Sequence, residues 1–204
     1  MKSLLPYCNK GLIEVGCDEA GRGCLSGPVV AGAVILDPNK LIKGLDDSKK
    51  LNEKSRLNMR DKILNHALDY GIGIGSNVEI DEINILNASF LAMHRAIEAL
   101  RKTSPEHILV DGNRFNPFKK TPYTCVVKGD GIYQSIAAAS ILAKTTRDEI
   151  MFSLHENHPQ YDWDRNKGYP TKKHRSAIAK YGPTKEHRMS FNLLGGDSQL
   201  SLFK

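Results

Sequence analysis

The sequence predicts a single α/β domain with a mixed central sheet of about five strands and helices on both sides of it. Apolar segments with strand character are interspersed with segments of helical periodicity along the chain. The first predicted strands do not show the regular strand–helix alternation of a fully parallel sheet, which favours a mixed one. The 204 residues suffice for one well-buried domain and leave little room for a second.

Five segments have the apolar patterns of strands, at residues 12–17, 28–36, 70–78, 107–110 and 123–127. The second is a nearly continuous apolar run, which indicates a strand that is covered on both faces. The third alternates glycine with isoleucine, which predicts a strand closely approached by another stretch of backbone. The first, fourth and fifth each run directly into a polar segment that contains an acidic residue.

Four segments have helical periodicity, at residues 52–68, 80–100, 135–155 and 171–181. We expect Ser48 or Asn52 to cap the first helix and Leu57 to face the core. The second helix is expected to break between residues 84 and 87, and to use His94 for packing rather than as a ligand. The third begins with small residues, which permit close contact with a sheet, and the last lies in a basic C-terminal segment.

Basic residues are concentrated in one part of the chain. The protein carries a formal net charge of +6 and has a sequence pI near 9.1. Residues 160–190 contain eight lysines and arginines against three acids, an excess that accounts for nearly the whole surplus. This distribution favours a polyanionic partner, although many basic proteins bind none.

The cysteines are scattered and include no C-x-x-C pair, at Cys8, Cys17, Cys24 and Cys125. This spacing predicts free thiols in a reducing cytoplasm and argues against a structural zinc site. The first residues lack an apolar run long enough for a signal peptide, and no segment approaches the length of a membrane span. We therefore expect a cytoplasmic protein with no membrane partner.

Acidic residues follow three of the predicted strands. Asp18 and Glu19 end the first strand, Asp111 ends the fourth, and Asp130 follows the fifth. Because neighbouring strand ends in an open α/β sheet can face one crevice, these side chains could meet there. Four carboxylates in contact would repel one another unless they were protonated or bound to cations. An all-oxygen cluster favours Mg²⁺ or Mn²⁺ over zinc, and two such ions about 3.5–4 Å apart would support phosphodiester hydrolysis.

Each acidic segment also has an ordinary structural explanation. Adjacent acids at a strand end are commonly solvated, and the segments around Asp111 and Asp130 have the glycines and asparagine that are typical of turns. In a regular strand Asp18 and Glu19 would point to opposite faces, so they could converge only where the strand ends. The recurrence of acids at strand ends, beside a basic segment, is what favours a metal site.

Several longer motifs resemble those of bacterial ribonuclease HII and occur in the same order. They extend from Gly16 to Phe191 and comprise G-C-D-E-A-G-R-G, L-D-D-S-K-K-L, D-E-I-N-I-L, V-D-G-N, V-V-K-G-D, S-I-A-A-A-S-I-L-A-K, K-G-Y-P-T and H-R-M-S-F. The resemblance implies a ribonuclease H-like fold and a metal-dependent endoribonuclease that cuts RNA within RNA–DNA hybrids. It also implies cleavage on the 5′ side of a single ribonucleotide in duplex DNA, leaving 3′-hydroxyl and 5′-phosphate ends.

The same resemblance implies roles for individual residues. The catalytic acids, which would hold two Mg²⁺ or Mn²⁺ ions in the substrate complex, are Asp18, Glu19, Asp111 and Asp130. The loop whose backbone would recognise the 2′-hydroxyl group is Gly21, Arg22 and Gly23. Tyr169 would stack at the junction and help to identify the ribose, whereas from the residues alone it would be interpreted as a partly buried surface aromatic. Phosphate contacts are expected from Lys49, Lys50, Lys144, Lys172 and Arg188.

The chain departs little from the family pattern. Cys24 follows the G-R-G stretch at a position where the family often has proline. The aspartate at position 130, and the lack of an N-terminal substrate-binding extension, favour ribonuclease HII over ribonuclease HIII. We expect a monomer with a catalytic domain over residues 1–192, which includes the basic helical segment, and a tail over residues 193–204.

The tail carries an apolar pentapeptide after a Gly-Gly-Asp tether, formed by Gln199, Leu200, Ser201, Leu202 and Phe203. Solubility explains such side chains poorly. One interpretation is that the tail packs on the domain. The other is that it resembles the short motif by which bacterial replication and repair proteins bind the DNA sliding clamp, with apolar side chains anchored in a pocket.

The leading hypothesis of an endoribonuclease has two competitors. A different enzyme on the same fold, such as a DNA resolvase or nuclease, would not require a ribonucleotide at the cleavage site. A non-catalytic module would bind nucleic acid without turnover. Under each hypothesis, binding should weaken steeply with salt, because phosphate contacts release counterions.

Overall fold

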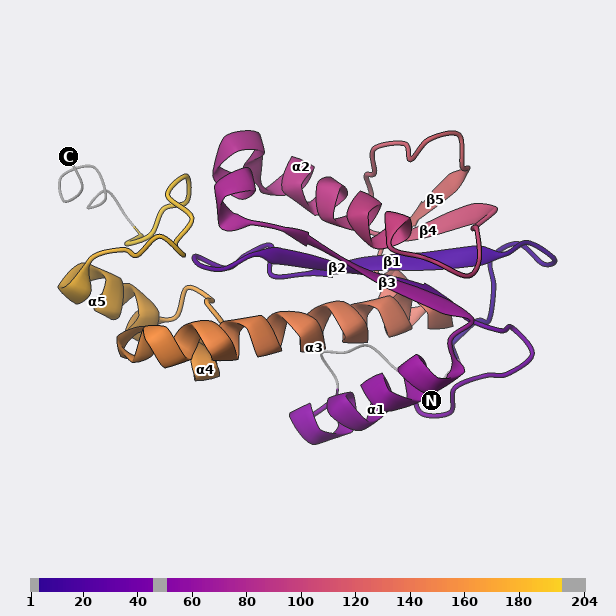
Figure 1. The fold of residues 1–204 in the computed structure, drawn as a ribbon, viewed down its shortest axis with the longest axis horizontal. Helices are drawn as coiled ribbons and strands as arrows, with labels where there is room; N and C mark the ends of the chain where they lie inside the picture. The colour runs from indigo at the N-terminus through magenta and orange to yellow at the C-terminus, as the bar shows by residue number, and fades with distance from the viewer. Residues whose placement is uncertain (1–3, 46–50, 196–204) are drawn as a thin grey trace.

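The fold is built on one five-stranded sheet with helices on both faces (Figure 1). The computed structural model describes residues 4–45 and 51–195. The strand order is β3-β2-β1-β4-β5. β1 pairs antiparallel with β2, and β2 with β3, whereas β1–β4 and β4–β5 are parallel. The predicted mixed sheet is therefore confirmed, with strands β1 (Glu14–Ala20), β2 (Val29–Ile35), β3 (Asp69–Gly75), β4 (His107–Asp111) and β5 (Tyr123–Val126).

The helices lie in two layers. α2 covers one face of the sheet, and α3 crosses the other face with α1 beside it (Figure 1). The long α3 extends beyond the sheet to a C-terminal segment of short helices. The helical elements are α1 (Glu53–His66), α2 (Asn77–Glu98), α3 (Gln134–Asn157), α4 (Trp163–Asn166), α5 (Lys172–Tyr181) and the 3-10 helices η1 (Gly129–Gly131) and η2 (Pro159–Tyr161). The four predicted helices are confirmed, and the short α4, η1 and η2 are additions.

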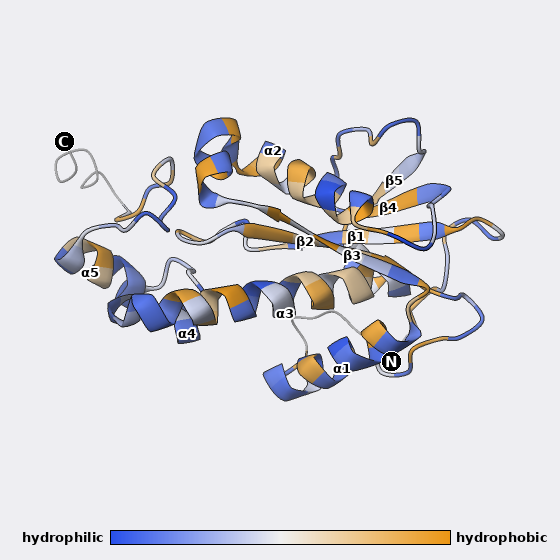
Figure 2. Ribbon diagram, viewed as in Figure 1, coloured by the Kyte–Doolittle hydropathy of each residue, from blue (hydrophilic) through white to orange (hydrophobic). Residues whose placement is uncertain are grey.

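The sheet is buried from both sides. All seven residues of β2 are buried, as the continuous apolar run predicts. One core cluster lies between the sheet and α2, and a second lies between the sheet, α1 and α3. Figure 2 shows the hydrophobic colour along β2, in agreement with its burial. A third cluster, around Trp163 and Ile178, includes the fully buried Leu193.

The contact between α3 and the sheet requires glycine. A Cβ added to Gly16 would lie 2.2 Å from the carbonyl carbon of Ser135, and one added to Gly32 would lie 2.5 Å from the carbonyl oxygen of Ala139. The small residues at the start of α3 complete the contact, because they let the helix backbone approach the strands. This close approach places Ser140 of α3 next to the end of β1.

Several local predictions are confirmed. Asn52 caps α1, where its side-chain oxygen accepts a hydrogen bond from the Ser55 amide at 2.8 Å. Asn84, with φ of 66°, interrupts α2 where the break was expected. His94 packs edge-on against Phe115, which agrees with a packing role. The alternative cap Ser48 lies outside the described residues.

Leu57 is the one helix position for which the expected orientation is wrong. Its side chain is 43% exposed, and the buried residues of α1 are Met59 and Ile63. The reason is that α1 does not contact the sheet with a broad face but packs beside α3, so a narrow stripe of the helix suffices for burial.

All four cysteines are free thiols, as their spacing predicts. Among the residues that the structure describes, no helix combines the length and the apolar character needed to cross a membrane.

The glycines of β3 generate a testable prediction about stability. A Cβ on Gly73 would lie 2.0 Å from the Ala92 carbonyl oxygen and 2.4 Å from the Ala96 amide nitrogen, both in α2. We expect Gly73→Ala to lower the free energy of unfolding by about 1–3 kcal/mol, because α2 must move away from the sheet. Urea denaturation followed by circular dichroism measures this loss. Gly131→Ala is the control, since a Cβ there meets nothing within 4 Å. Equal stability of the two variants would contradict the close approach of α2.

Candidate active site

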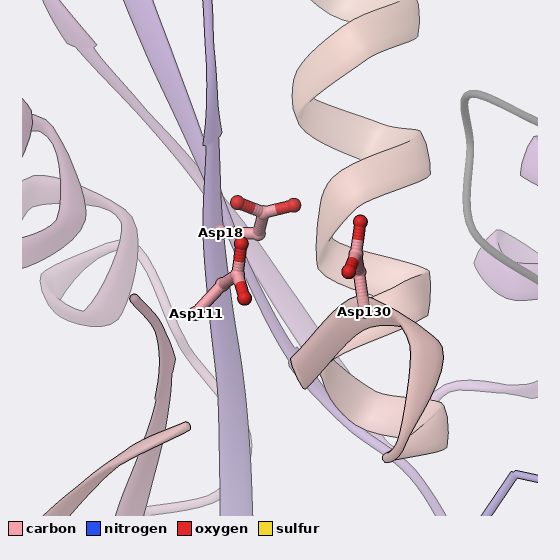
Figure 3. Close-up of side chains that lie close together, drawn as sticks. All are labelled: Asp18, Asp111 and Asp130. Carbon is pink, nitrogen blue, oxygen red and sulfur yellow. The ribbon is translucent and has the colours of Figure 1, made fainter. Parts of the chain in front are cut away.

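Three aspartates from separate segments meet near the carboxyl ends of β1 and β4. Asp18 lies on β1, Asp111 ends β4, and Asp130 lies in η1 after β5. One carboxylate oxygen from each can be chosen so that all three lie within 4.8 Å of one another. Figure 3 shows Asp18 and Asp111 side by side, with Asp130 across from them. The expectation that acids from three strand ends converge is thus correct for these residues.

The register of the sheet explains why two of the aspartates are neighbours. β1 and β4 run parallel, with Cys17 opposite Val110, so the next residues, Asp18 and Asp111, lie side by side. Cys17 and Val110 face the core on the α2 side, so the alternation of a strand turns both aspartates toward α3. There Asp18 receives a hydrogen bond from Ser140, and its Oδ1 accepts the Glu19 amide at 2.7 Å.

The end of β4 and the 3-10 helix η1 are joined by one hydrogen bond. Asp111 Oδ1 accepts the backbone amide of Gly129 at 2.7 Å, which fixes η1 against the end of β4. Asp130 is the next residue and is only 4% exposed. The tight turn of η1 therefore presents Asp130 to the two strand aspartates.

Burial and mutual repulsion make the cluster electrostatically unfavourable without a cation. Burial, followed by the nearby charges of Glu19 and Asp111, raises the pKa of Asp18 well above its usual value. A divalent cation would offset the repulsion among these carboxylates and the cost of burying the Asp18 charge. The donor set is entirely carboxylate oxygen and contains no histidine or cysteine, which fits Mg²⁺ or Mn²⁺.

Glu19 lies at the edge of this cluster. Because it follows Asp18 on a strand, its side chain leaves the opposite side of β1, and it is not one of the three clustered acids. Its carboxylate instead pairs with Arg22, with 3.1 Å between Oε1 and Nη1. Burial raises the pKa of Glu19, and the Arg22 charge opposes that shift. Glu19 nevertheless borders the same pocket as Asp18 and Asp111, so the strand end brings the adjacent acids to one cavity.

That pocket has a volume of about 300 Å³ and joins Asp18, Glu19 and Asp111 to the G-R-G loop. The loop Gly21–Arg22–Gly23 forms one wall, and Tyr169 and Lys144 also border the cavity. Gly21 has φ of 98°, a conformation that residues with a Cβ rarely adopt, so the loop turns sharply after β1. The pocket therefore brings together Asp18, Glu19 and Asp111 with the predicted ribose-reading loop and the predicted stacking tyrosine. Asp130 joins this group through its cluster with the other two aspartates.

Tyr169 is held through its backbone and through its hydroxyl group. The Tyr169 carbonyl oxygen lies 3.0 Å from Nδ1 of the buried His174, whose Nε2 accepts a hydrogen bond from Trp163 Nε1 at 3.0 Å. Burial lowers the pKa of His174, which favours the neutral ring that this arrangement requires. The Tyr169 hydroxyl makes a hydrogen bond with the thiol of Cys24, the residue that replaces the usual proline. The residue as a whole is 41% exposed, which leaves it accessible for stacking.

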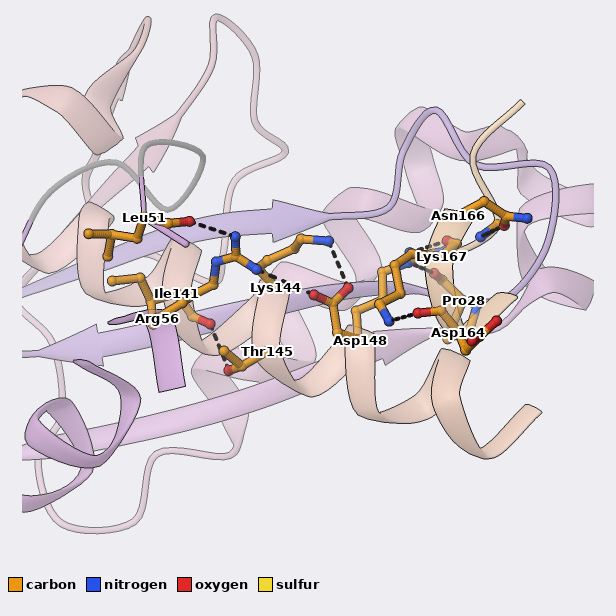
Figure 4. A network of polar contacts seen from close by, with 12 residues as sticks. Pro28, Leu51, Arg56, Ile141, Lys144, Thr145, Asp148, Asp164, Asn166 and Lys167 are labelled. Atoms are coloured by element: carbon orange, nitrogen blue, oxygen red, sulfur yellow. Dashed lines mark hydrogen bonds and ion pairs between the residues drawn. The ribbon is translucent and has the colours of Figure 1, made fainter. Parts of the chain in front are cut away.

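Two cations reach the pocket from the helices. Lys144 of α3 donates to Asp148 Oδ1 at 2.7 Å, and Arg56 of α1 approaches Asp148 Oδ2 at 3.5 Å (Figure 4). Lys144 was expected from the sequence. Arg56 and Ser140 were not assigned a role there, although both border the pocket. Ser140 belongs to a quoted motif, but no local signal identifies Arg56, because it comes to the site only through the packing of α1 on α3.

The remaining predicted contacts have different placements. Lys172 is exposed at the start of α5 and does not border the pocket. Arg188 is fully buried and donates to backbone carbonyls, so it is not positioned for the expected phosphate contact. Outside the described residues lie Lys49, Lys50 and the tail residues Gln199, Leu200, Ser201, Leu202 and Phe203.

A mixed α/β sheet that collects carboxylates in this way defines a metal-dependent hydrolase of phosphate esters. The sequence model for ribonuclease HII matches residues 15–194. The ribonuclease HII of Bacteroides thetaiotaomicron is 62% identical over 199 residues, which cover 98% of each chain. That of Porphyromonas gingivalis is 56% identical over 185 residues, 91% of this chain and 92% of the relative. The chain belongs to the ribonuclease HII family and is a metal-dependent endoribonuclease.

Solved structures agree with this assignment. The ribonuclease H2 of Pyrococcus horikoshii OT3 superimposes with a TM-score of 0.73 and 27% identity, covering 89% of this chain and 94% of that one. A ribonuclease HII from Archaeoglobus fulgidus, solved in complex with PCNA, gives a TM-score of 0.75 and 26% identity, with 91% and 98% coverage. The expected ribonuclease H-like fold is confirmed.

The electrostatics of the cluster predict that removal of the Asp18 charge stabilises the metal-free protein. Because the pKa of Asp18 is raised in the folded protein, its ionisation opposes folding, and its contribution to stability is lost as pH rises through that pKa. We expect Asp18→Asn to raise the free energy of unfolding of the metal-free protein at neutral pH by ~1–3 kcal/mol. Urea denaturation in EDTA measures the gain, and added Mn²⁺ should stabilise the wild type but not the variant.

The matched control is Asp61→Asn, which removes an exposed aspartate of α1 and should change stability little. A metal-free Asp18→Asn protein that is less stable than the wild type at neutral pH would contradict this description of the cluster.

Proposed function

We propose that the protein hydrolyses the RNA strand of RNA–DNA hybrids and cuts on the 5′ side of single ribonucleotides embedded in duplex DNA. The products would carry 3′-hydroxyl and 5′-phosphate ends. One observation carries this proposal, namely that Asp18, Glu19 and Asp111 share one pocket with the G-R-G loop and Tyr169. A site with both parts can test for a ribose at the position where it cuts.

The acids would hold the cofactor. Asp18, Asp111 and Asp130 offer converging oxygens, and Glu19 stands beside them at the pocket wall. Two bound Mg²⁺ or Mn²⁺ ions would supply activation of a water and stabilisation of the leaving oxygen. The protein's own contribution is to present the carboxylates at a fixed spacing, with Ser140 orienting Asp18 and the Gly129 amide orienting Asp111.

The G-R-G loop and Tyr169 would identify the substrate. At a lone ribonucleotide, the 2′-hydroxyl is the group that distinguishes it from the surrounding DNA. A Cβ on Gly23 would meet no atom within 4 Å, and its absence would let backbone groups of the loop approach that hydroxyl. The half-exposed ring of Tyr169 would stack at the junction, a contact that tolerates any base.

Basic residues would bind the flanking phosphates. Lys144 lies in the pocket next to the acids, and Lys172 lies on the exposed side of α5. We also assign Lys49 and Lys50 this role on the basis of their motif. Such contacts position the duplex without reading its sequence, which suits an enzyme that must act at any ribonucleotide.

The decisive experiment uses a DNA duplex that contains one ribonucleotide. We expect the wild type to cut on its 5′ side, to leave an all-DNA duplex intact, and to generate ends that a ligation assay identifies as 3′-hydroxyl and 5′-phosphate. Asp111→Asn should lower the cleavage rate by at least about 100-fold, because one cation ligand is lost. Its affinity for the duplex, measured by fluorescence anisotropy, should change little.

Asp61→Asn serves as the control and should cut as the wild type does. Cleavage of the all-DNA duplex would favour a DNA nuclease or resolvase on this fold. Binding without cleavage by the wild type would favour a non-catalytic module. Either result would reject the proposed function.

We further propose that residues 199–203 bind the bacterial DNA sliding clamp. Support comes from the sequence of the pentapeptide and from the similar Archaeoglobus fulgidus protein, which was solved with PCNA. Deleting residues 199–204 should abolish retention on immobilised clamp while leaving cleavage of a short duplex unchanged. Replacing Leu202 and Phe203 with alanine keeps the chain length and should have the same effect. Clamp retention by the truncated protein would refute the assignment.

A further inference from the structure

Two arginines lie completely inside the protein and form no ion pair within 4 Å in the described chain, although Asp81 acts on Arg188 from farther away. Arg147 of α3 is 1% exposed, and Arg188, beyond α5, is 0% exposed. Burial lowers the pKa of Arg188 to about 10, which leaves it charged at neutral pH. A buried cation is costly unless its donors are hydrogen-bonded, so the acceptors of these two side chains indicate what they do.

Arg147 joins two loops that are distant in sequence. Its Nε donates to the Pro28 carbonyl at 2.9 Å and its Nη2 to the Ser26 carbonyl at 3.1 Å, both in the segment that follows the G-R-G loop. Its Nη1 donates to the Lys167 carbonyl at 2.8 Å. Lys167 begins the K-G-Y-P stretch that carries Tyr169, and Figure 4 shows Pro28 and Lys167 close together beside α3.

Arg188 holds the same segment at two further points. Its Nη1 donates to the Arg22 carbonyl at 3.0 Å and its Nε to the Gly27 carbonyl at 2.9 Å. The backbone amide of Arg188 also donates to the Leu25 carbonyl at 2.9 Å. The middle residue of the G-R-G loop is therefore bonded directly to a buried guanidinium group.

The two loops pack closely against the Arg147 guanidinium group and against each other. A Cβ on Gly21 would lie 2.0 Å from Arg147 Nε, so the first glycine of the loop rests on this side chain. A Cβ on Gly168 would lie 2.7 Å from the Ser26 carbonyl oxygen, and the Leu25 amide donates to the Gly168 carbonyl at 2.8 Å. The G-R-G loop and the tyrosine loop thus form one unit, with Arg147 beneath both.

We propose that Arg147 and Arg188 are positioning residues for ribose recognition, which hold the G-R-G loop and Tyr169 in a fixed relative position at the wall of the pocket. The inference rests on the proposed function and extends it to residues that do not touch the substrate. Both positions require arginine, because its planar guanidinium group carries several donors that bond several backbone carbonyl groups at the same time. Lysine would retain the charge but could not make these contacts together.

The test compares Arg147→Lys with the wild type on two substrates, a duplex with one ribonucleotide and a fully RNA–DNA hybrid. Steady-state kinetics at a temperature well below unfolding should show kcat for the single ribonucleotide reduced by about 10- to 100-fold, as expected for a misplaced contact. KM should change much less, because the phosphate-binding lysines are untouched. Activity on the hybrid, which offers a ribose at every position, should fall less, and Mn²⁺ affinity measured by calorimetry should stay unchanged.

The control for simple destabilisation is Ile63→Ala. Ile63 is a fully buried core residue of α1, and the substitution removes no contact with either loop. It should lower the unfolding temperature while leaving the ratio of the two activities at the wild-type value. If Arg147→Lys does not fold, Arg188→Lys decides, since it releases only the G-R-G segment and should shift the same ratio.

The outcomes separate the two proposals. A wild type that fails to cut at a single ribonucleotide refutes the proposed function. A wild type that cuts there, together with folded lysine variants whose activity ratio equals that of the wild type, refutes the positioning role alone. Equal losses on both substrates would also refute it, because they would show a general structural effect.

Discussion

The close contact between α3 and the central strands is the constraint on which the rest of the structure depends. Gly16 and Gly32 remove the side chains that would otherwise separate the layers, and the small residues of α3 fill the space. The contact buries the end of β1 and surrounds Asp18 with a helix and a neighbouring aspartate. A carboxylate in this position is unfavourable for folding and favourable for holding a cation. The same packing therefore stabilises the core and makes the ionised form of Asp18 unfavourable.

The C-terminal segment contributes to the site from the other side. Its own core cluster, around Trp163, fixes the K-G-Y-P stretch, and the buried arginines connect that stretch to the loop after β1. Burying two guanidinium groups without carboxylates is a weak way to stabilise a fold, because desolvation offsets much of the gain from hydrogen bonds. Their placement is more readily explained by a need to fix the relative positions of the two loops, since both loops border the pocket.

Local patterns predicted much of the fold and the acidic cluster. The continuous apolar run of β2, the glycine–isoleucine alternation of β3 and the small residues of α3 each reflect a packing environment that leaves a direct signature in composition. The aspartates were recognisable because they recur at strand ends. Leu57 was assigned incorrectly because periodicity gives the apolar side of a helix but not how much of that side its neighbours cover. Arg188 was assigned to phosphate because its charge was visible in the sequence and its burial was not.

The sequence by itself determined the class of the fold, the identity of the acids and the family to which the chain belongs, because strand patterns, residue chemistry and motif order are all local properties. Only the tertiary structure decided which acids share a cluster, since the parallel register of β1 and β4 places Asp18 beside Asp111 and leaves Glu19 at the edge. The tertiary structure also brings Arg56 to the pocket and joins Arg147 by hydrogen bonds to two loops that are distant in sequence. These relations join residues far apart in the chain, and they exist only once the helices pack against the sheet.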